Sequence, residues 1–80
     1  MKTKNEIKNW IISWFEKRNS DVDVNVTLDF YSQGLIDSFG VFELICKLEN
    51  HFSFQFTDDD FKLPDFRTID GLSRIIMKKL

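Results

Sequence analysis

Cysteine and histidine, which form disulfides and activate catalytic nucleophiles, are scarce in this sequence. Its 80 residues include one cysteine, Cys46, and one histidine, His51. A lone cysteine cannot form an internal disulfide, which agrees with a reducing compartment. On one helix, Cys46 and His51 would point about 140° apart, which excludes a cysteine–histidine dyad. Ser38 would lie several turns from the histidine on the same helix, which excludes a catalytic serine triad. We therefore expect a protein that is not an enzyme.

Long apolar runs and complete metal-binding patterns are also missing. The longest early apolar run, residues 10–12, is too short for the core of a signal peptide or for a membrane span. We therefore expect a cytoplasmic protein that does not insert into membranes. The segment from Asp21 to Asn25 is spaced like the opening of a calcium loop, but Val26 and Ser32 stand where that loop needs glycine and glutamate. No metal site is expected.

Length and charge narrow the class of protein further. Eighty residues suffice for one domain with a single core, so we expect one domain over residues 1–80. The net charge is −2, but residues 21–60 carry nine acidic side chains and one basic one, whereas residues 1–20 and 61–80 each carry +3. An acidic segment repels nucleic acid and attracts basic proteins, more weakly as salt rises. A solvated acidic surface without a partner is the alternative.

The first half of the chain contains two segments with the signals of long helices. One is predicted from a Thr3–Glu6 capping box to the Lys17–Arg18 pair. The other is predicted after an Asp37 N-cap. Its core-facing stripe comprises Val41, Leu44, Ile45, Leu48 and Phe52. Residues 19–33 between these helices are predicted to form a long loop.

The second half of the chain predicts two further helices. A short one follows Thr57, has Asp58, Asp59 and Asp60 in its first turn, and ends at Pro64. A last helix starts near Thr68, with an apolar face of Ile69, Leu72, Ile75, Ile76 and Leu80. The long loop contributes further apolar side chains to the predicted core, namely Val22, Val24, Val26, Leu28, Phe30 and Tyr31. The expected fold is all-α, with three long helices and one short one.

The most informative segment joins the long loop to the second predicted helix. It reads Gly34-Leu35-Ile36-Asp37-Ser38-Phe39. In this segment and in the order of its predicted helices, the chain resembles the carrier-protein family, whose acyl and peptidyl carriers bear 4'-phosphopantetheine on the serine of such an Asp-Ser pair. The resemblance implies a small acyl-carrier-like bundle in which a phosphopantetheinyl transferase attaches the arm covalently to Ser38.

The expected position of Ser38 suits that modification on physical grounds. Ser38 follows the Asp37 N-cap, so it lies in the first helical turn, where backbone N–H groups and the helix dipole favour a phosphodiester anion. A serine at a junction of loop and helix is also accessible to a large modifying enzyme. Taken without its context, the Asp-Ser pair would be interpreted as a helix cap only.

The resemblance also implies where partner enzymes bind. An acyl- or aminoacyl-loading ligase and downstream synthase or transferase enzymes are expected on the second helix, at Phe39, Phe42, Glu43, Cys46 and Glu49. Packing of Phe39 and Phe42 at the periphery of the core is the alternative. Gly40, Lys47 and the Asn50-His51 pair make this helix less acidic than in fatty-acid carriers, which favours different partners.

Two functions are compatible with the sequence. In the first, the chain is a monomeric shuttle for acyl, aminoacyl or peptidyl groups, which the arm holds as thioesters. In the second, it is an unmodified helical interaction subunit derived from a carrier fold. The intact Asp37, Ser38 and Phe39 favour the first function. Fatty acyl, polyketide, amino acid and D-alanyl carriers share this fold and serine, and specificity lies largely in the enzymes that load them.

Overall fold

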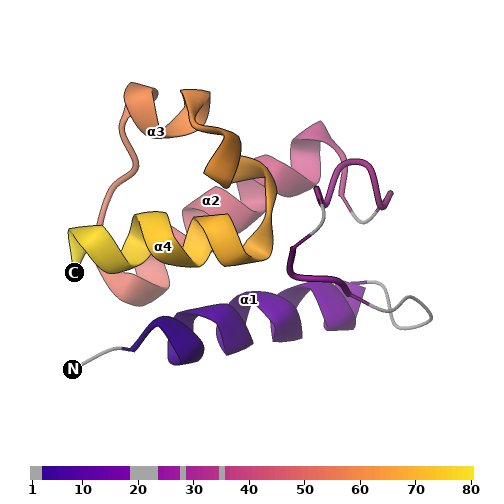
Figure 1. Cartoon of the computed structure of the whole chain (residues 1–80), viewed down its shortest axis with the longest axis horizontal. Helices are drawn as coiled ribbons and strands as arrows, with labels where there is room; N and C mark the ends of the chain where they lie inside the picture. Colours follow the sequence, from indigo (N-terminus) through magenta and orange to yellow (C-terminus); the bar gives the residue numbers. More distant parts are fainter. Residues whose placement is uncertain (1–2, 19–23, 28, 35) are drawn as a thin grey trace.

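Helices form most of the described chain, which comprises residues 3–18, 24–27, 29–34 and 36–80 of the computed structural model. The elements are α1 (Lys4–Arg18), α2 (Ser38–Phe52), α3 (Asp58–Lys62), the 3₁₀ turn η1 (Pro64–Arg67) and α4 (Ile69–Lys79). Helices α1 and α4 lie side by side, and α3 stands above α4 (Figure 1). The predicted all-α bundle of three long helices and one short one is confirmed, and the described residues contain no strand.

The first helix buries one of its faces completely. At its N-terminus the Thr3 hydroxyl oxygen accepts a hydrogen bond from the backbone N–H of Glu6 at 3.2 Å, which is one of the two hydrogen bonds of the predicted capping box. Its fully buried side chains are Ile7, Ile11 and Phe15, and Trp10 and Trp14 are half-buried beside them. The spacing of four residues between successive buried positions places them on one side of the helix, as its amphipathic pattern requires.

The second helix begins and ends with defined caps. The Asp37 carboxylate accepts from the N–H of Gly40 at 2.8 Å, which confirms the predicted N-cap. Leu44, Leu48 and Phe52 of the predicted stripe are buried, and Val41 and Ile45 are half-buried. The helix ends at Ser53, whose left-handed backbone (φ 58°) directs its N–H to the carbonyl of Glu49.

The segment between α2 and α4 differs in one respect from the sequence prediction. A complete capping box joins Thr57 and Asp60, as the N-cap prediction anticipated. Helix α3 then ends at Lys62, and Pro64 opens η1 instead of ending α3. Proline suits this position for two reasons. The N–H of the first residue in a helical turn has no acceptor within the helix, so its absence costs nothing, and the proline ring fixes the required φ.

The last helix carries the most regular apolar face. Thr68 caps it by accepting from the N–H of Gly71 at 2.9 Å. Four of the five predicted core residues are buried, namely Ile69, Leu72, Ile75 and Ile76. The prediction was wrong for Leu80, which is 50 % exposed because it lies beyond the last helical residue, Lys79. No helix in the described ranges is long and apolar enough to cross a membrane.

The loop between α1 and α2 is hydrogen-bonded to the end of η1 and to the start of α4. The Phe30 N–H donates to the Arg67 carbonyl at 2.9 Å, and the Asp70 N–H donates to the Val26 carbonyl at 3.0 Å. Phe30 is fully buried, and Val24, Val26 and Tyr31 are packed against the core, as predicted. Val22 and Leu28, which were predicted to join them, lie outside the described residues.

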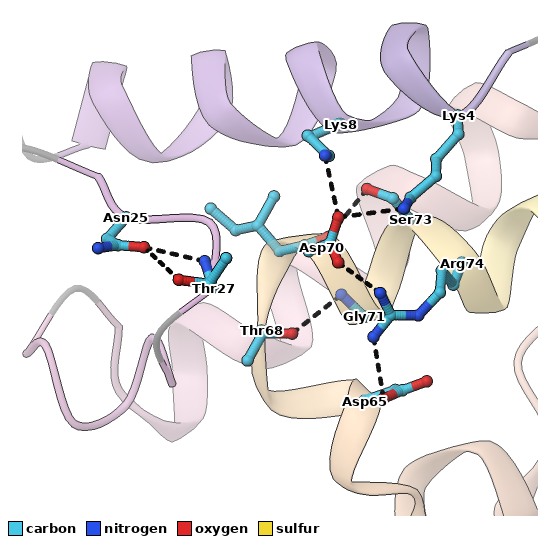
Figure 2. Close-up of polar contacts among 11 residues, drawn as sticks. Lys4, Lys8, Asn25, Thr27, Asp65, Thr68, Asp70, Gly71, Ser73 and Arg74 are labelled. Carbon is cyan, nitrogen blue, oxygen red and sulfur yellow. Dashed lines mark hydrogen bonds and ion pairs between the residues drawn. The ribbon is translucent and has the colours of Figure 1, made fainter.

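A single carboxylate connects α1 to the corner between η1 and α4. Asp70 forms ion pairs with Lys8 at 2.9 Å, with Lys4 at 3.2 Å and with Arg74, which also pairs with Asp65 at 3.2 Å (Figure 2). The hydrogen bonds from Lys8 and Lys4 hold the pKa of Asp70 far below its ordinary value. The ionised form of Asp70 therefore stabilises the folded state.

We expect Asp70→Asn to lower the free energy of unfolding at neutral pH by roughly 1 kcal/mol, because it removes a network of partly exposed ion pairs. The pKa of Asp70 is lower in the folded than in the unfolded chain, so this stabilisation is lost as the pH falls below the ordinary value of 3.8. Urea unfolding at several pH values should show the two proteins converge in acid. An unchanged difference between them would contradict this role, and Glu16→Gln on α1 is the control.

The close packing of η1 on α4 requires a glycine at position 71. A Cβ atom there would lie 2.1 Å from the carbonyl oxygen of Asp65 and 2.6 Å from its Cα. Both atoms belong to the backbone, so relief needs η1 and α4 to separate. We expect Gly71→Ala to cost more than about 3 kcal/mol in urea unfolding, whereas Ser13→Ala on the exposed side of α1 should cost less than about 0.5 kcal/mol. Near-native stability of Gly71→Ala would show that η1 and α4 can move apart at little cost.

Candidate functional site

Ser38 is the first residue of α2 and is exposed. Asp37 has extended backbone (φ −108°, ψ −176°), its side chain accepts from Gly40, and its carbonyl accepts from the N–H of Val41 at 3.0 Å. The N–H groups of the first helical turn point out of the helix end together with the positive end of its dipole. The hydroxyl of Ser38 therefore lies where an attached anion is stabilised and where an enzyme can reach it.

A hydrogen-bonded turn leads the chain into this position. The carboxylate of Asp29 accepts from the N–H of Tyr31 at 2.8 Å and from that of Ser32 at 3.3 Å, and it forms an ion pair with Arg67. Loss of hydration opposes ionisation, but the Arg67 and backbone hydrogen bonds outweigh it and hold the pKa of Asp29 below its ordinary value. Gly34 closes the turn with a positive φ of 72°, a conformation that favours glycine. Leu35 of the predicted motif lies outside the described residues.

An apolar cleft opens beside Ser38. It has a volume of about 310 Å³ and is lined by Tyr31, Ser38, Val41, Phe42, Ile45 and Phe61. A wider hollow of about 590 Å³ shares Tyr31, Val41, Ile45 and Phe61 and extends along η1 to Arg67. Burial raises the pKa of Tyr31, so its phenol stays neutral at physiological pH. The cleft therefore offers uncharged, mainly apolar contacts to a group that is attached at the serine.

A protein-family model, described as the phosphopantetheine attachment site, matches residues 9–76. The chain belongs to this carrier-domain family. The match runs from the second turn of α1 to the last turn of α4, so it includes the α2 N-terminus and the cleft beside it. A comparison with curated protein sequences finds no match.

The family identifies 4'-phosphopantetheine as the prosthetic group, and the geometry of this carrier domain fits it. Ser38 offers an exposed hydroxyl at a helix N-terminus, and Asp37 fixes the first turn without covering it. The apolar cleft adjoins the same hydroxyl. The sequence analysis predicted Asp37 and Ser38 as site residues. It did not assign Tyr31 of the loop and Phe61 of α3, which meet α2 at the cleft only in the folded chain.

The five residues predicted to bind partners do not share one environment. Phe39 is 86 % exposed and Phe42 is 71 % exposed, so the alternative in which they pack in the core is wrong. Glu43 and Cys46 are also exposed. Glu49 is half-buried, and its carboxylate accepts from the N–H of Phe56 at 2.9 Å. The side chains of Phe39 and Phe42 thus form an exposed apolar patch on α2, and contact of such a patch with water is unfavourable.

Three acidic side chains in the middle of the chain form ion pairs within the carrier domain. Its basic ends supply the partners, in the pairs Arg18–Glu43 at 3.2 Å, Lys79–Asp60 at 2.7 Å and Arg67–Asp29. The predicted acidic surface is therefore weaker than the sequence suggested. Among the described residues, no group of three or more histidine, cysteine, aspartate or glutamate side chains could hold a metal ion. His51 stacks on Trp10, with ring centroids 5.1 Å apart.

Exposure separates the two phenylalanines on the outside of α2 from those in the core. We expect Phe39→Ala and Phe42→Ala to change the free energy of unfolding by less than about 0.5 kcal/mol each. Phe30→Ala, at a fully buried position, should cost about 3–5 kcal/mol. Thermal or urea unfolding of the three variants checks this contrast. A large loss of stability for Phe39→Ala would show that its ring packs on the fold.

Proposed function

We propose that this carrier domain bears 4'-phosphopantetheine on Ser38 and shuttles acyl, aminoacyl or peptidyl groups between partner enzymes. The observation that carries the proposal is the family match over residues 9–76, combined with the exposure of Ser38 at the first position of α2. No other serine in the described chain combines an Asp N-cap, the start of a long helix and an adjoining apolar cleft.

The residues around Ser38 would hold the attachment point in place. The carboxylate of Asp37 fixes the first turn of α2 by its hydrogen bond to Gly40. The N–H groups and the dipole of that turn favour the negative charge of a phosphodiester. When bound, the arm supplies a terminal thiol that holds the transported group as a thioester. The cleft lined by Tyr31, Phe42 and Phe61 would shield an apolar part of the arm or its cargo.

The outer face of α2 would serve as the docking surface for partners. Phe39 and Phe42 are exposed next to Ser38, so an enzyme that reaches the serine also meets both rings. Buried aromatic anchors dominate the energy of many interfaces. The expected partners are a phosphopantetheinyl transferase, a loading ligase and downstream synthase or transferase enzymes. The domain itself would perform no chemistry, and it would act as a cytoplasmic monomer over residues 1–80.

The test is the intact mass of the protein after incubation with coenzyme A, magnesium and a broad-specificity phosphopantetheinyl transferase. We expect the wild type to gain one phosphopantetheine group and Ser38→Ala to gain none. Ser32→Ala, at an exposed serine in the preceding turn, is the matched control and should be modified like the wild type. Circular dichroism should show the same helix content in all three proteins.

The opposite result would favour the other function considered from the sequence. If the folded wild type gains no mass while a known carrier in the same reaction is modified, the domain is an unmodified interaction subunit. Its exposed Phe39 and Phe42 would then be the contacts with the complex it belongs to.

A further inference from the structure

Arg18 reaches from the end of α1 to the docking face of α2. Its guanidinium group contacts the carboxylate of Glu43, with Nη1 and Oε2 at 3.2 Å. The same group lies over the ring of Trp14, 5.1 Å from its centroid. The two contacts hold the arginine side chain against α2 although 36 % of it is exposed.

A glycine on α2 makes room for this arrangement. Gly40 is buried, and a Cβ atom there would lie 2.9 Å from Nη2 of Arg18 and 2.7 Å from Cγ1 of Ile36. Any larger residue would push the guanidinium group away from the helix. The glycine that makes α2 less acidic therefore also admits a cation from α1.

The charge that α2 presents to a partner is small as a result. Helix α2 contains two glutamates, of which Glu43 is paired with Arg18 and Glu49 accepts from the Phe56 N–H. Lys47 adds a positive charge to the same helix. The exposed rings of Phe39 and Phe42 lie beside this nearly neutral stretch. Attraction to a basic surface is therefore weak, and apolar contact remains as the main source of affinity.

We propose that Arg18 is a specificity-determining residue that neutralises Glu43, so that α2 selects partners with an apolar docking pocket over partners with a basic one. The inference rests on the proposed function, because it concerns enzymes that dock on α2. In this inference α1, which is not itself the docking helix, contributes to the choice of partner. Arg18 acts through Glu43 and is in this sense a positioning residue.

Three variants separate this role from a general effect of net charge. Arg18→Gln leaves Glu43 unpaired and removes one positive charge. Lys17→Gln removes the same charge from the neighbouring position of α1, where the side chain lines a groove with Trp10 and Trp14. The double variant Arg18→Gln, Glu43→Gln restores the neutrality of the original pair with two uncharged side chains.

The measurement is the initial rate of phosphopantetheine transfer, followed by intact mass, with a transferase whose docking surface is basic. It is made at about 10 mM and about 0.15 M ionic strength, between which the screening length falls from about 30 Å to about 8 Å. At low ionic strength we expect Arg18→Gln to react roughly two- to tenfold faster than the wild type, with a steeper decrease on adding salt. Lys17→Gln and the double variant should match the wild type in both respects.

The other outcomes are equally distinct. If Arg18→Gln reacts no faster than Lys17→Gln, or more slowly than the wild type, Arg18 does not act by neutralising Glu43 and the inference is wrong. Transfer of the group to the wild type would still support the carrier function. If the double variant keeps the altered salt dependence of Arg18→Gln, the inference is also wrong. If no protein gains the group, the carrier function fails and the inference fails with it. Helix content by circular dichroism verifies that each variant is folded.

Discussion

Asp70 is the residue whose polar contacts join α1, the loop before α2 and the corner between η1 and α4. Its carboxylate holds Lys4 and Lys8 of α1, and its backbone N–H holds the loop at Val26. Through Arg74 it also fixes the corner at Asp65, where η1 meets α4. That corner supplies Arg67, whose carbonyl binds Phe30 and whose side chain binds Asp29. The turn before Ser38 is thus connected to α1 through Arg67, Asp65 and the Asp70 network.

The uneven charge of the chain has an internal explanation. The sequence interpretation assigned the acidic middle segment to the surface, as an attraction for basic partners. In the structure the basic ends fold back on it, so Arg18, Arg67 and Lys79 each meet an acidic side chain of that segment. Such pairs join residues 19 to 38 positions apart in the sequence, and local patterns do not determine them. The separation of acidic and basic segments along this chain therefore contributes to its tertiary structure, through these ion pairs, as well as to the charge of its surface.

Local rules of helix formation were sufficient to predict most of the fold and to place Ser38 at the start of α2. Asp37 and Thr57 were recognised as N-caps, and the last helix was placed near Thr68, because these signals depend on residues within a single turn. The 3₁₀ turn at Pro64 was missed, since a proline after a short helix is compatible with either an end or a new start. The cleft formed with Tyr31 and Phe61 and the contact of Arg18 with Glu43 depend on how the helices pack. No pattern within one helix contains that information.

The arrangement of the helices also separates the two ends of the chain from Ser38. Helix α1 begins and helix α4 ends at one end of the molecule, whereas α2 begins at the opposite end (Figure 1). Extra polypeptide joined at either terminus, whether an affinity tag or a neighbouring module, would therefore emerge away from Ser38. The fold can thus be tethered to a surface or to a larger assembly by its ends while the hydroxyl of Ser38 stays exposed.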